Sequence, residues 1–480
     1  MEEMINAINN IIWSNALIVL CLATGIYFSF ATGFLQVRYL KDMVKLLFGS
    51  TGSKTGVSSF QAFAMALSGR IGTGNIAGVA TAIAMGGPGA VFWMWLIAFL
   101  GSASAYVEAT LGQLYKEVKD GQYRGGPAFY IEKGLGIKWY AAVFAVATIL
   151  STAVFLPGVQ SNSIALSSYN AFSIPVEYTG IGLVVLLGLI IVGGVKRIAK
   201  VAEVIVPFMA GGYILLALII ISFHFDQIPN VILLIFKSAF NFEPAFAGVI
   251  GMAIAWGVKR GIYSNEAGQG TAPHAAAAAE VNHPAKQGLV QAFSVYVDTL
   301  FVCTATAFMI LFTGKYNVQH PDGGYIVENI PGTEIGPAYT QQAIAEHFPA
   351  IGGPAVAISL LFFAFTTIMA YYYMAETNLS YLDKQGRHKW AIWILRLLIL
   401  AATYYGTVKT AAAAWTLGDI GVGLMAWLNL IAILLLRKPA LKALEDYRKQ
   451  KKAGQDPVFQ ADELKIDGIE YWKSDESKTD

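Results

Sequence analysis

The sequence predicts an all-α polytopic membrane protein, with one N-terminal helix followed by two sets of five transmembrane helices. Three observations predict this class. Hydrophobic residues make up 56% of the 480 residues and charged residues only 13%, which is about half the charged fraction of a soluble domain. Several apolar runs reach the ~18 residues that indicate a membrane span. Two of the apolar segments are interrupted by glycine and polar residues, as in the binding-site helices of secondary transporters.

We expect about eleven transmembrane helices, one for each long apolar segment. The segments are 13–34, 60–85, 89–115, 139–169, 177–195, 200–223, 245–280, 285–313, 350–378, 390–408 and 411–436. Lys and Arg residues concentrate in alternate loops between these segments. Because basic loops stay in the cytoplasm, we expect a cell-membrane protein with its N-terminus outside and its C-terminus in the cytoplasm.

The first segment is expected to be a retained helix. The chain begins Met1-Glu2-Glu3-Met4, whereas a signal peptide begins with positive charge and ends at a small-residue cleavage site. Residues 1–50 are therefore read as an N-terminal helix and a cytoplasmic loop.

The segment 60–85 is interrupted between Ser68 and Gly78, where the sequence reads SGRIGTGNIAG. A broken helix is tolerated in lipid only where it lines a site. Free N–H groups at the start of its second half attract a carboxylate, and free carbonyls at the end of its first half bind a cation. The candidate N–H donors belong to Thr73, Gly74 and Asn75. The candidate Na⁺ ligands are the carbonyls near Ser68 and Ile71. The alternative is a packing kink in a glycine-rich helix.

Two short patterns in this region suggest a nucleotide but do not support one. Residues 72–77 match the dinucleotide fingerprint G-x-G-x-x-A, which requires a preceding strand and a βαβ unit. Residues 52–55, GSKT, lack the spacing and the ending of a phosphate loop. The net charge is +2 and no basic tract indicates nucleic acid. We therefore expect neither nucleotide nor nucleic acid as a partner, and an ion gradient as the energy source.

The segment 245–280 is interrupted in the stretch from Trp256 to Gly268, WGVKRGIYSNEAG. The carbonyls around Ala255 to Gly257 are expected to bind the ammonium group of a substrate. Trp256 either forms a wall of the pocket or packs between helices, and the sequence favours neither.

The two interrupted segments each begin a set of five helices. Because five is odd, the two sets have opposite topology, which is the arrangement of an inverted repeat. The expected division is 51–224 for the first repeat, 225–440 for the second and 441–480 for a cytoplasmic tail.

Isolated polar residues within apolar segments supply the other candidates. The hydroxyls of Thr366 and Thr367 could complete a cation site, or could bond back to their own helix carbonyls. Gln160 is expected to hydrogen-bond a substrate, with an interhelix contact as the alternative. Tyr371 lies one turn after Thr367 on the same helix face and is expected to form a pocket wall.

Among the charged residues inside predicted spans, Arg70 lies in the first break, and Glu108 and Asp298 are carboxylates within apolar helices. Charges at this depth are functional by default. Each carboxylate is expected either to relay a proton or, by default, to pair with Arg70, Lys259 or Arg260. The sequence leaves both readings open.

An enzyme is not expected. The chain contains no HExxH, no Gly-x-Ser-x-Gly and no paired aspartates of the kind that intramembrane enzymes use. Its two cysteines, Cys21 and Cys303, lie in apolar segments, where simple packing is a better reading than a disulfide or a metal site. No cofactor is expected, apart from a co-transported ion.

Several long blocks resemble the alanine/glycine:cation symporter family, sodium-coupled amino-acid carriers with a LeuT-type fold. The blocks are Val57 to Trp95, Gly125-Gly126-Pro127, Gln160 to Ser163, and Arg260 to Ala277 with its continuation into HPAKQGLVQAF and VDTLFVCTATA. The resemblance covers nearly the whole chain. It implies Na⁺ symport of a small neutral amino acid through a five-plus-five core with one preceding helix.

The resemblance also implies residue roles. Thr73, Gly74 and Gln160 match positions that hold the substrate carboxylate. The sodium site of the fold is matched by Thr366 and Thr367 and by the carbonyls of Ser68, Ile71 and Phe363. Tyr371 stands where the family commonly has tryptophan, which can change the pocket volume. Alanine or glycine is the expected substrate; glutamine or another neutral amino acid, a proton-coupled carrier and an uncoupled facilitator are the alternatives.

Overall fold

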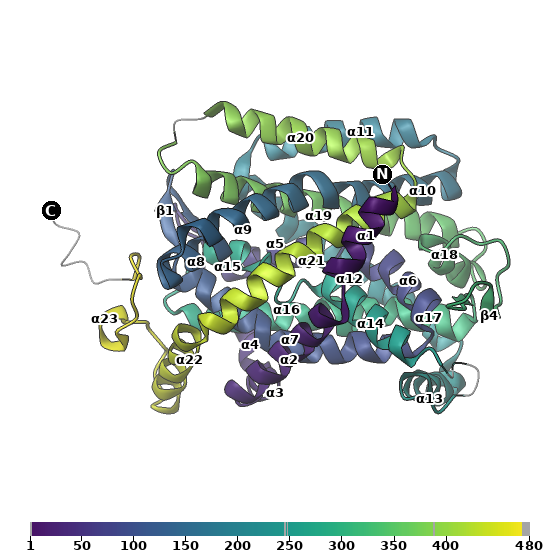
Figure 1. Ribbon diagram of the computed structural model, residues 1–480, viewed down its shortest axis with the longest axis horizontal. Coiled ribbons are helices and arrows are strands. Elements are labelled where there is room, and N and C mark those ends of the chain that lie inside the picture. Colours follow the sequence, from purple (N-terminus) through teal and green to yellow (C-terminus); the bar gives the residue numbers. More distant parts are fainter. Residues whose placement is uncertain (1, 244–245, 247, 387–388, 473–480) are drawn as a thin grey trace.

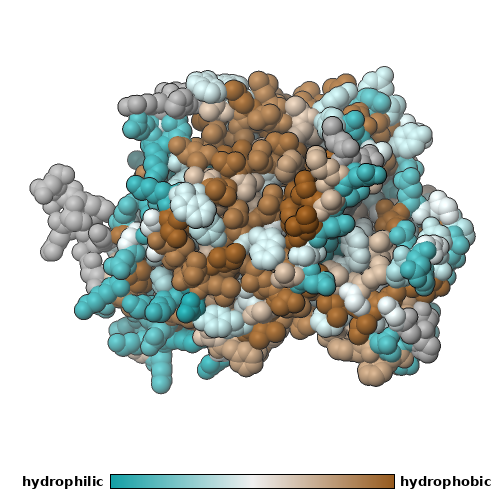
Figure 2. All heavy atoms as spheres, in the orientation of Figure 1, coloured by the Kyte–Doolittle hydropathy of each residue, from teal (hydrophilic) through white to brown (hydrophobic). Residues whose placement is uncertain are grey.

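The computed structural model describes residues 2–243, 246, 248–386 and 389–472. Most of its helices run along one common direction, across the width of Figure 1. Hydrophobic side chains form a band across the middle of the molecule, and hydrophilic ones gather at its two ends (Figure 2). One end carries β1, α22 and α23, and the other carries α13, α18 and β4. This surface pattern is that of a protein whose middle lies in a bilayer, so the chain is a multi-pass membrane protein.

The chain to residue 222 forms most of the first half of the bundle. Its elements are α1 (Glu2–Ile12), α2 (Asn15–Ala31), α3 (Leu35–Arg38), α4 (Leu40–Leu46), α5 (Ser59–Arg70), the π-helical turn η1 (Gly74–Gly78), α6 (Val79–Gly86), α7 (Gly89–Leu114), β1 (Glu117–Lys119), β2 (Gln122–Arg124), α8 (Pro127–Leu135), α9 (Lys138–Leu150), the π-helical turn η2 (Ser151–Phe155), α10 (Leu156–Phe172), α11 (Val176–Ile191) and α12 (Gly194–Ser222).

The remaining elements follow in the second half. They are the 3₁₀ turn η3 (Phe225–Gln227), α13 (Ile228–Ala239), α14 (Ile250–Asn265), α15 (Ala272–Ala278), α16 (Pro284–Val295), the π-helical segment η5 (Tyr296–Cys303), α17 (Thr304–Thr313), β3 (Asn317–Gln319), β4 (Tyr325–Glu328), α18 (Pro337–Ala345), α19 (Gly352–Leu382), α20 (Lys389–Thr407), α21 (Ala411–Leu435), α22 (Arg437–Lys452) and α23 (Ala461–Leu464). Each strand pair is an antiparallel hairpin; Val118 lies opposite Tyr123 in one and Val318 opposite Val327 in the other.

Within the described residues, eight helices are long and apolar enough to cross a membrane. The other predicted spans are occupied by the shorter α11 and by two broken helices, α5–η1–α6 and α14–α15. The mostly helical membrane fold is therefore confirmed. The total of eleven spans and the division into repeats at 51–224 and 225–440 stay predictions.

The first predicted segment differs in detail. Helical structure begins before residue 13, because α1 precedes α2. The two helices meet at a turn around Trp13 and Ser14. The indole N–H of Trp13 donates to the carbonyl of Asp419 at 2.8 Å, so this turn is held against α21.

Burial separates the central helices from the peripheral ones. In the most apolar window of α7, 72% of residues are buried, and the helix from Pro284 to Thr313 reaches the same share. The corresponding windows of α12 and α20 are 33% and 28% buried, which is expected for helices that face lipid. The first broken helix lies inside, with every residue of α5 from Ala62 to Arg70 buried.

Candidate functional site

The first predicted break is confirmed. The helix α5 ends at Arg70, Ile71 has an extended backbone (φ −74°, ψ 92°), and helical structure resumes with η1 at Gly74. The backbone N–H of Gly72 donates to the Asn75 side chain at 2.8 Å. This local bond stabilises the break by satisfying one of the amide groups that the interrupted helix leaves open.

A cluster of oxygen atoms surrounds the hydroxyl of Thr367. The carbonyl oxygens of Ser68, Phe363 and Ile71 lie 2.8, 3.0 and 3.2 Å from Thr367 Oγ1. A hydroxyl carries one proton, so it cannot donate to all three carbonyls at once. The cluster therefore holds an excess of acceptor oxygens in a buried place, which is the ligand set that unwound membrane helices offer to Na⁺.

The neighbouring Thr366 behaves differently. Its hydroxyl lies 2.9 Å from the Phe362 carbonyl and 3.0 Å from the Phe363 carbonyl, both in its own helix. The alternative of back-bonding thus describes Thr366. Thr367 reaches across to the first broken helix, and the two hydroxyls share the Phe363 carbonyl.

The opposite side of the same break faces Gln160. The backbone N–H and the hydroxyl of Thr73 donate to Gln160 Oε1 at 2.9 and 2.8 Å. The amide oxygen of Gln160 thus occupies the place that the break offers to an anion. Gly74, the next residue, packs on α14, because a Cβ on it would lie 3.1 Å from Ser264 Cα and 3.2 Å from the Tyr263 ring.

Two buried tyrosines belong to helices that flank the break. The Tyr263 ring adjoins Gly74, and its hydroxyl has no hydrogen-bond partner among the described residues. Tyr371 follows Thr367 by one turn in α19, and its place in a pocket wall stays a prediction. Tyr263 was missed by the sequence reading, although its place within the second interrupted segment is a usable signal.

Asn75 differs from the prediction. Its backbone N–H, expected to meet a substrate carboxylate, donates to the Gly72 carbonyl at 3.3 Å. Its side chain holds the break through Gly72 and donates to Asp298 Oδ1 at 2.6 Å. Asn75 therefore shapes the site instead of offering it a free donor.

The second break lies at the C-terminal end of the predicted stretch, and not around Ala255 to Gly257 as expected for the ammonium-binding carbonyls. The helix α14 is continuous from Ile250 to Asn265, and the interruption begins at Glu266, whose φ is 55°. The carbonyls around Ala255 to Gly257 are thus inside a regular helix. A Cβ on Gly257 would lie 2.5 Å from both the Ala90 carbonyl oxygen and Trp93 Cβ, so this glycine permits close packing on α7 instead of a break.

Trp256 lies near basic side chains. Lys259 Nζ and the Arg260 guanidinium are each 5.1 Å from the centre of its ring. These cation–π contacts connect Trp256 to the two basic side chains that follow it in α14.

Glu108 supports the second break. Its carboxylate accepts the backbone N–H groups of Gly268 and Gly270 at 3.2 and 3.0 Å and the Asn429 amide at 2.7 Å. A negative charge suits amide donors left open by an interrupted helix. These bonds take the place of the ion pair that was expected for Glu108.

Asp298 joins the two broken helices. It accepts from Asn75 Nδ2 at 2.6 Å and from Ser264 Oγ at 2.9 Å, and its neighbour Thr299 donates at 2.7 Å. Arg70 instead donates to the Gln291 carbonyl at 3.1 Å and to the Ser294 hydroxyl. The expected direct pairing of Asp298 with a basic residue is therefore wrong.

The carboxylate partner of Lys259 and Arg260 is Asp419, which the sequence reading missed. Arg260 Nη1 and Nη2 lie 2.8 and 3.0 Å from its two oxygens, and Lys259 Nζ lies 2.7 Å from Oδ2. The Arg260 guanidinium is 4.5 Å from the Trp415 ring and 5.5 Å from the Tyr263 ring. This charged layer therefore covers Tyr263 on the side toward the start of α14. Asp419 is the lone charged residue of the segment 411–436, a signal that could have identified it.

The described part of the chain was also compared with the requirements of a metal site and of a disulfide. No group of three His, Cys, Asp or Glu side chains within it could hold a metal ion. Cys21 and Cys303 are buried and free of a disulfide.

The geometry makes Gly72 a residue on which both sides of the break depend. A Cβ there would lie 2.6 Å from Thr367 Oγ1 and 2.8 Å from Gln160 Oε1. We expect Gly72→Ala to weaken sodium-dependent and substrate-dependent thermal stabilisation together, each by roughly tenfold in apparent affinity, because overpacking costs about 1–3 kcal/mol. Gly182→Ala on α11 is the matched control, since nothing lies within 4 Å of a Cβ there. Loss of only one stabilisation would contradict a shared break.

Comparison with known proteins gives a consistent result. The family model described as the sodium:alanine symporter family matches residues 1–461. YrbD of Bacillus subtilis (strain 168) is 63% identical over 475 residues, which is 99% of this chain and 98% of that protein. The sodium/proton-dependent alanine carrier protein of Bacillus sp. (strain PS3) is 55% identical over 90% of this chain and 97% of that protein. The probable sodium/glutamine symporter GlnT of Bacillus subtilis is 47% identical over 100% of this chain and 98% of that protein.

A solved structure shares the architecture. It is a substrate-bound, outward-open Na⁺-coupled sialic acid symporter, with a TM-score of 0.53 and 14% sequence identity. The match covers 94% of this chain and 93% of that chain. At this identity the likeness shows the fold alone, and that fold is the expected LeuT type.

Proposed function

The chain belongs to the sodium:alanine symporter family, and from this premise we propose that it imports a small neutral amino acid, alanine first, together with Na⁺. It is a transporter, not an enzyme. One observation carries the proposal. The same break in the first broken helix presents amide donors toward Gln160 on one side and a cluster of acceptor oxygens at Thr367 on the other.

The substrate carboxylate would bind the N–H groups of Thr73 and Gly74 and displace the oxygen of Gln160. The Gln160 amide could then turn and donate its own N–H to the carboxylate. The ammonium group would meet the last carbonyls of α14, near Tyr263 and Ser264, since the final carbonyls of a helix lack intrahelical partners. These carbonyls replace the ones first expected around Ala255 to Gly257.

Tyr263 and Tyr371 would enclose the substrate side chain, and this supports a small one such as that of alanine. The PS3 relative is named an alanine carrier. The glutamine alternative keeps support from the name of GlnT. Trp256 would line the route from outside beside the Arg260 layer, and Gly257 would contribute by close packing on α7.

Sodium would bind among Ser68, Ile71, Phe363, Thr366 and Thr367. A cation there would pull the end of α5 and the helix α19 together, and it would thereby order Gly72 and Thr73. Sodium and the substrate would strengthen each other's binding by the same factor. Alternating access would follow as the two proposed repeats move against each other, with the N-terminus outside and the segment from 441 in the cytoplasm; its last residues, 473–480, lie outside the described part.

Proton coupling is the second candidate, because the PS3 relative is named sodium/proton-dependent. Three buried carboxylates near the site could carry the proton, those of Asp298, Glu108 and Glu266. An uncoupled facilitator has no such support.

The test is uptake of labelled alanine into proteoliposomes with an inward Na⁺ gradient, and separately with an inward proton gradient. Unlabelled glycine and glutamine serve as competitors. Concentrative uptake driven by Na⁺ is the expected result. Uptake that ignores both gradients would leave a facilitator, and uptake driven by protons alone would move the coupling from the threonines to the carboxylates.

Gln160→Glu tests the carboxylate position. It places a negative charge where the substrate carboxylate is proposed to bind, and like charges in a partly desolvated site repel by several kcal/mol. We expect alanine uptake to fall by roughly tenfold or more, while stabilisation of the protein by Na⁺ persists. Unchanged alanine affinity would remove Gln160 from the site. The sodium-dependent melting temperature of the variant is the control for folding.

A further inference from the structure

Backbone hydrogen bonds join the residue before the first broken helix to the end of the second. The N–H of Val57, just before α5, donates to the Ala278 carbonyl at 2.9 Å, and the N–H of Glu280 donates to the Val57 carbonyl at 2.8 Å. Val57 and Ala279 form an isolated parallel bridge. We call this contact the seam. The start of α5 cannot move away from the end of α15 unless the seam opens.

The hairpin β1–β2 covers the seam. The Tyr123 hydroxyl donates to Glu280 Oε2 at 2.7 Å, and Lys116 Nζ donates to the Ala279 carbonyl at 3.1 Å. The Tyr123 ring also lies against Gly56, where an added Cβ would be 2.6 Å from the ring. A side chain from the hairpin thus contacts both partners of the seam.

The C-terminal segment 453–472, here called the strap, adds a second layer. The hydroxyls of Tyr471 and Tyr123 are 2.8 Å apart, and the Trp472 indole N–H donates to the Gln113 carbonyl at 2.8 Å. Lys116 Nζ lies 4.1, 4.5 and 5.2 Å from the ring centres of Tyr123, Tyr471 and Trp472. Lys116 is fully buried, and the strap supplies two of the three rings that face its ammonium group.

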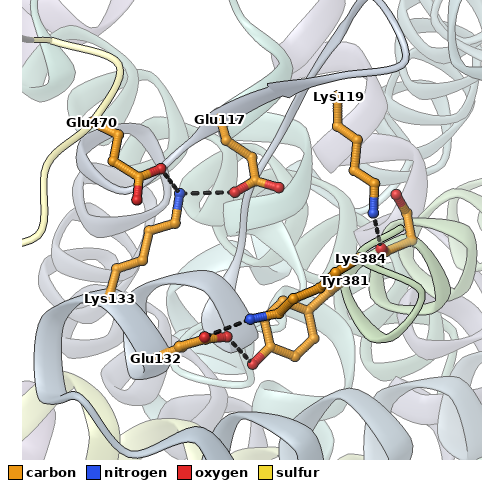
Figure 3. A network of polar contacts seen from close by, with 8 residues as sticks. Glu117, Lys119, Glu132, Lys133, Tyr381, Lys384 and Glu470 are labelled. Atoms are coloured by element: carbon orange, nitrogen blue, oxygen red, sulfur yellow. Dashed lines mark hydrogen bonds and ion pairs between the residues drawn. The ribbon is translucent and has the colours of Figure 1, made fainter. Parts of the chain in front are cut away.

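The strap is anchored on both sides of the seam. Asp456 pairs with Lys286 of α16 at 2.6 Å, and the N–H of Phe459 donates to the Asn282 carbonyl at 2.9 Å. At its other end, Glu470 pairs with Lys133 of α8 at 2.7 Å. Figure 3 shows Lys133 between Glu470 and Glu117. Movement between α16 and α8 would break one of these anchors.

The anchors are of a reversible kind. The side chains of Asp456 and Glu470 are 75% and 65% exposed, and exposed ion pairs contribute little to stability. The strap can therefore detach while the membrane helices stay folded.

We infer that the strap holds the seam closed and sets how often the site opens toward the end of the molecule that carries the C-terminal segment. This inference rests on the proposed alternating access of the symporter. Detachment of Tyr471 and Trp472 would hydrate Lys116, release Tyr123 and allow α5 to leave α15. The strap would thus regulate the release step without contacting the substrate.

The experiment measures seam opening directly. Val57→Cys is introduced into the full chain with Cys21→Ser and Cys303→Ser, and inside-out vesicles are treated with a membrane-impermeant maleimide. Adding Tyr471→Ala with Trp472→Ala should raise the labelling rate roughly tenfold, the factor that corresponds to losing such contacts. The same variant in proteoliposomes should raise the rate of alanine efflux.

A matched pair of charge-changing variants tests the strap without removing its two large aromatic side chains. Glu470→Lys breaks an anchor and should raise labelling by about twofold, whereas Glu463→Lys makes the same charge change at an exposed strap residue and should leave it unchanged. Equal labelling in all variants would overturn the inference. Given alanine efflux by the unmodified chain, faster labelling with unchanged efflux would also overturn it, because the strap would then only cover the seam. Labelling needs no substrate, so an absence of alanine transport by the unmodified chain would refute the proposed function and not the strap.

Discussion

Replacing Thr367 with valine is expected to abolish the sodium dependence of uptake, whereas replacing Thr366 with valine should weaken it only slightly. Thr367 Oγ1 lies within 3.2 Å of carbonyls in both α5 and α19, but Thr366 bonds within its own helix. Valine keeps the shape of threonine and removes the oxygen. The hydroxyl can donate its single proton to one of the three buried carbonyls at a time, so the change removes one hydrogen bond, at about 1–3 kcal/mol for a lost polar contact, together with the oxygen proposed to bind the ion.

The measurement is the Na⁺ concentration that gives half-maximal alanine uptake. For Thr367→Val it should rise by roughly tenfold or more, or uptake should vanish, following the conversion of 1.4 kcal/mol to one power of ten. Thr367→Ser keeps the hydroxyl and should restore sodium dependence. If Thr366→Val were the more damaging change, the ion would lie closer to Phe362 than to Ser68.

The contrast between the two broken helices shows what sequence patterns can and cannot predict. The first break was located correctly because its glycines coincide with polar residues that bond across it, as Gly72 and Asn75 do. The second lies at the end of its predicted stretch, and its open carbonyls were assigned too early because Gly257 and Gly261 also lie in that stretch. A glycine that permits two helices to touch and a glycine that permits a break look alike in one sequence. Only the packing of Gly257 against Ala90 distinguishes them.

Isolated polar residues were identified more successfully than their partners. Gln160 and Thr367 stand out in apolar segments, and both adjoin the first break. Two of the three partners of Glu108 are backbone N–H groups, which carry no side-chain signature. Its role in holding the second break therefore could not be predicted.

The strap was also not predictable, for a related reason. Its contacts join Tyr471 and Trp472 to Lys116 and Tyr123, more than three hundred residues earlier in the chain. Patterns of local periodicity describe helices, but they do not indicate which distant surface an aromatic pair will cover.

The second large effect is expected at Asp419. Its single carboxylate compensates Lys259 and Arg260, and the side chains of Arg260 and Asp419 are only 2% and 4% exposed. Removing one partner of a buried ion pair leaves an uncompensated charge and costs about 3–5 kcal/mol. Asp419→Asn would leave two positive groups facing an amide. We therefore expect it to prevent closure of this layer over Tyr263 and to eliminate most alanine uptake.

The comparison with Lys259→Met separates charge compensation from general damage. That change leaves the two-point contact between Arg260 and Asp419 in place, so uptake should stay within about threefold of the unmodified chain, an effect of the size of one weak pair. Asp419→Glu keeps the charge and should recover part of the activity. Each variant is first compared for detergent-solubilised melting temperature. If Asp419→Asn melted like the unmodified chain and transported alanine normally, this ion pair would have no part in closing the site. If it melted normally but failed to transport, the charged layer would be a gate, because the loss would then lie in the transport cycle and not in the folded state.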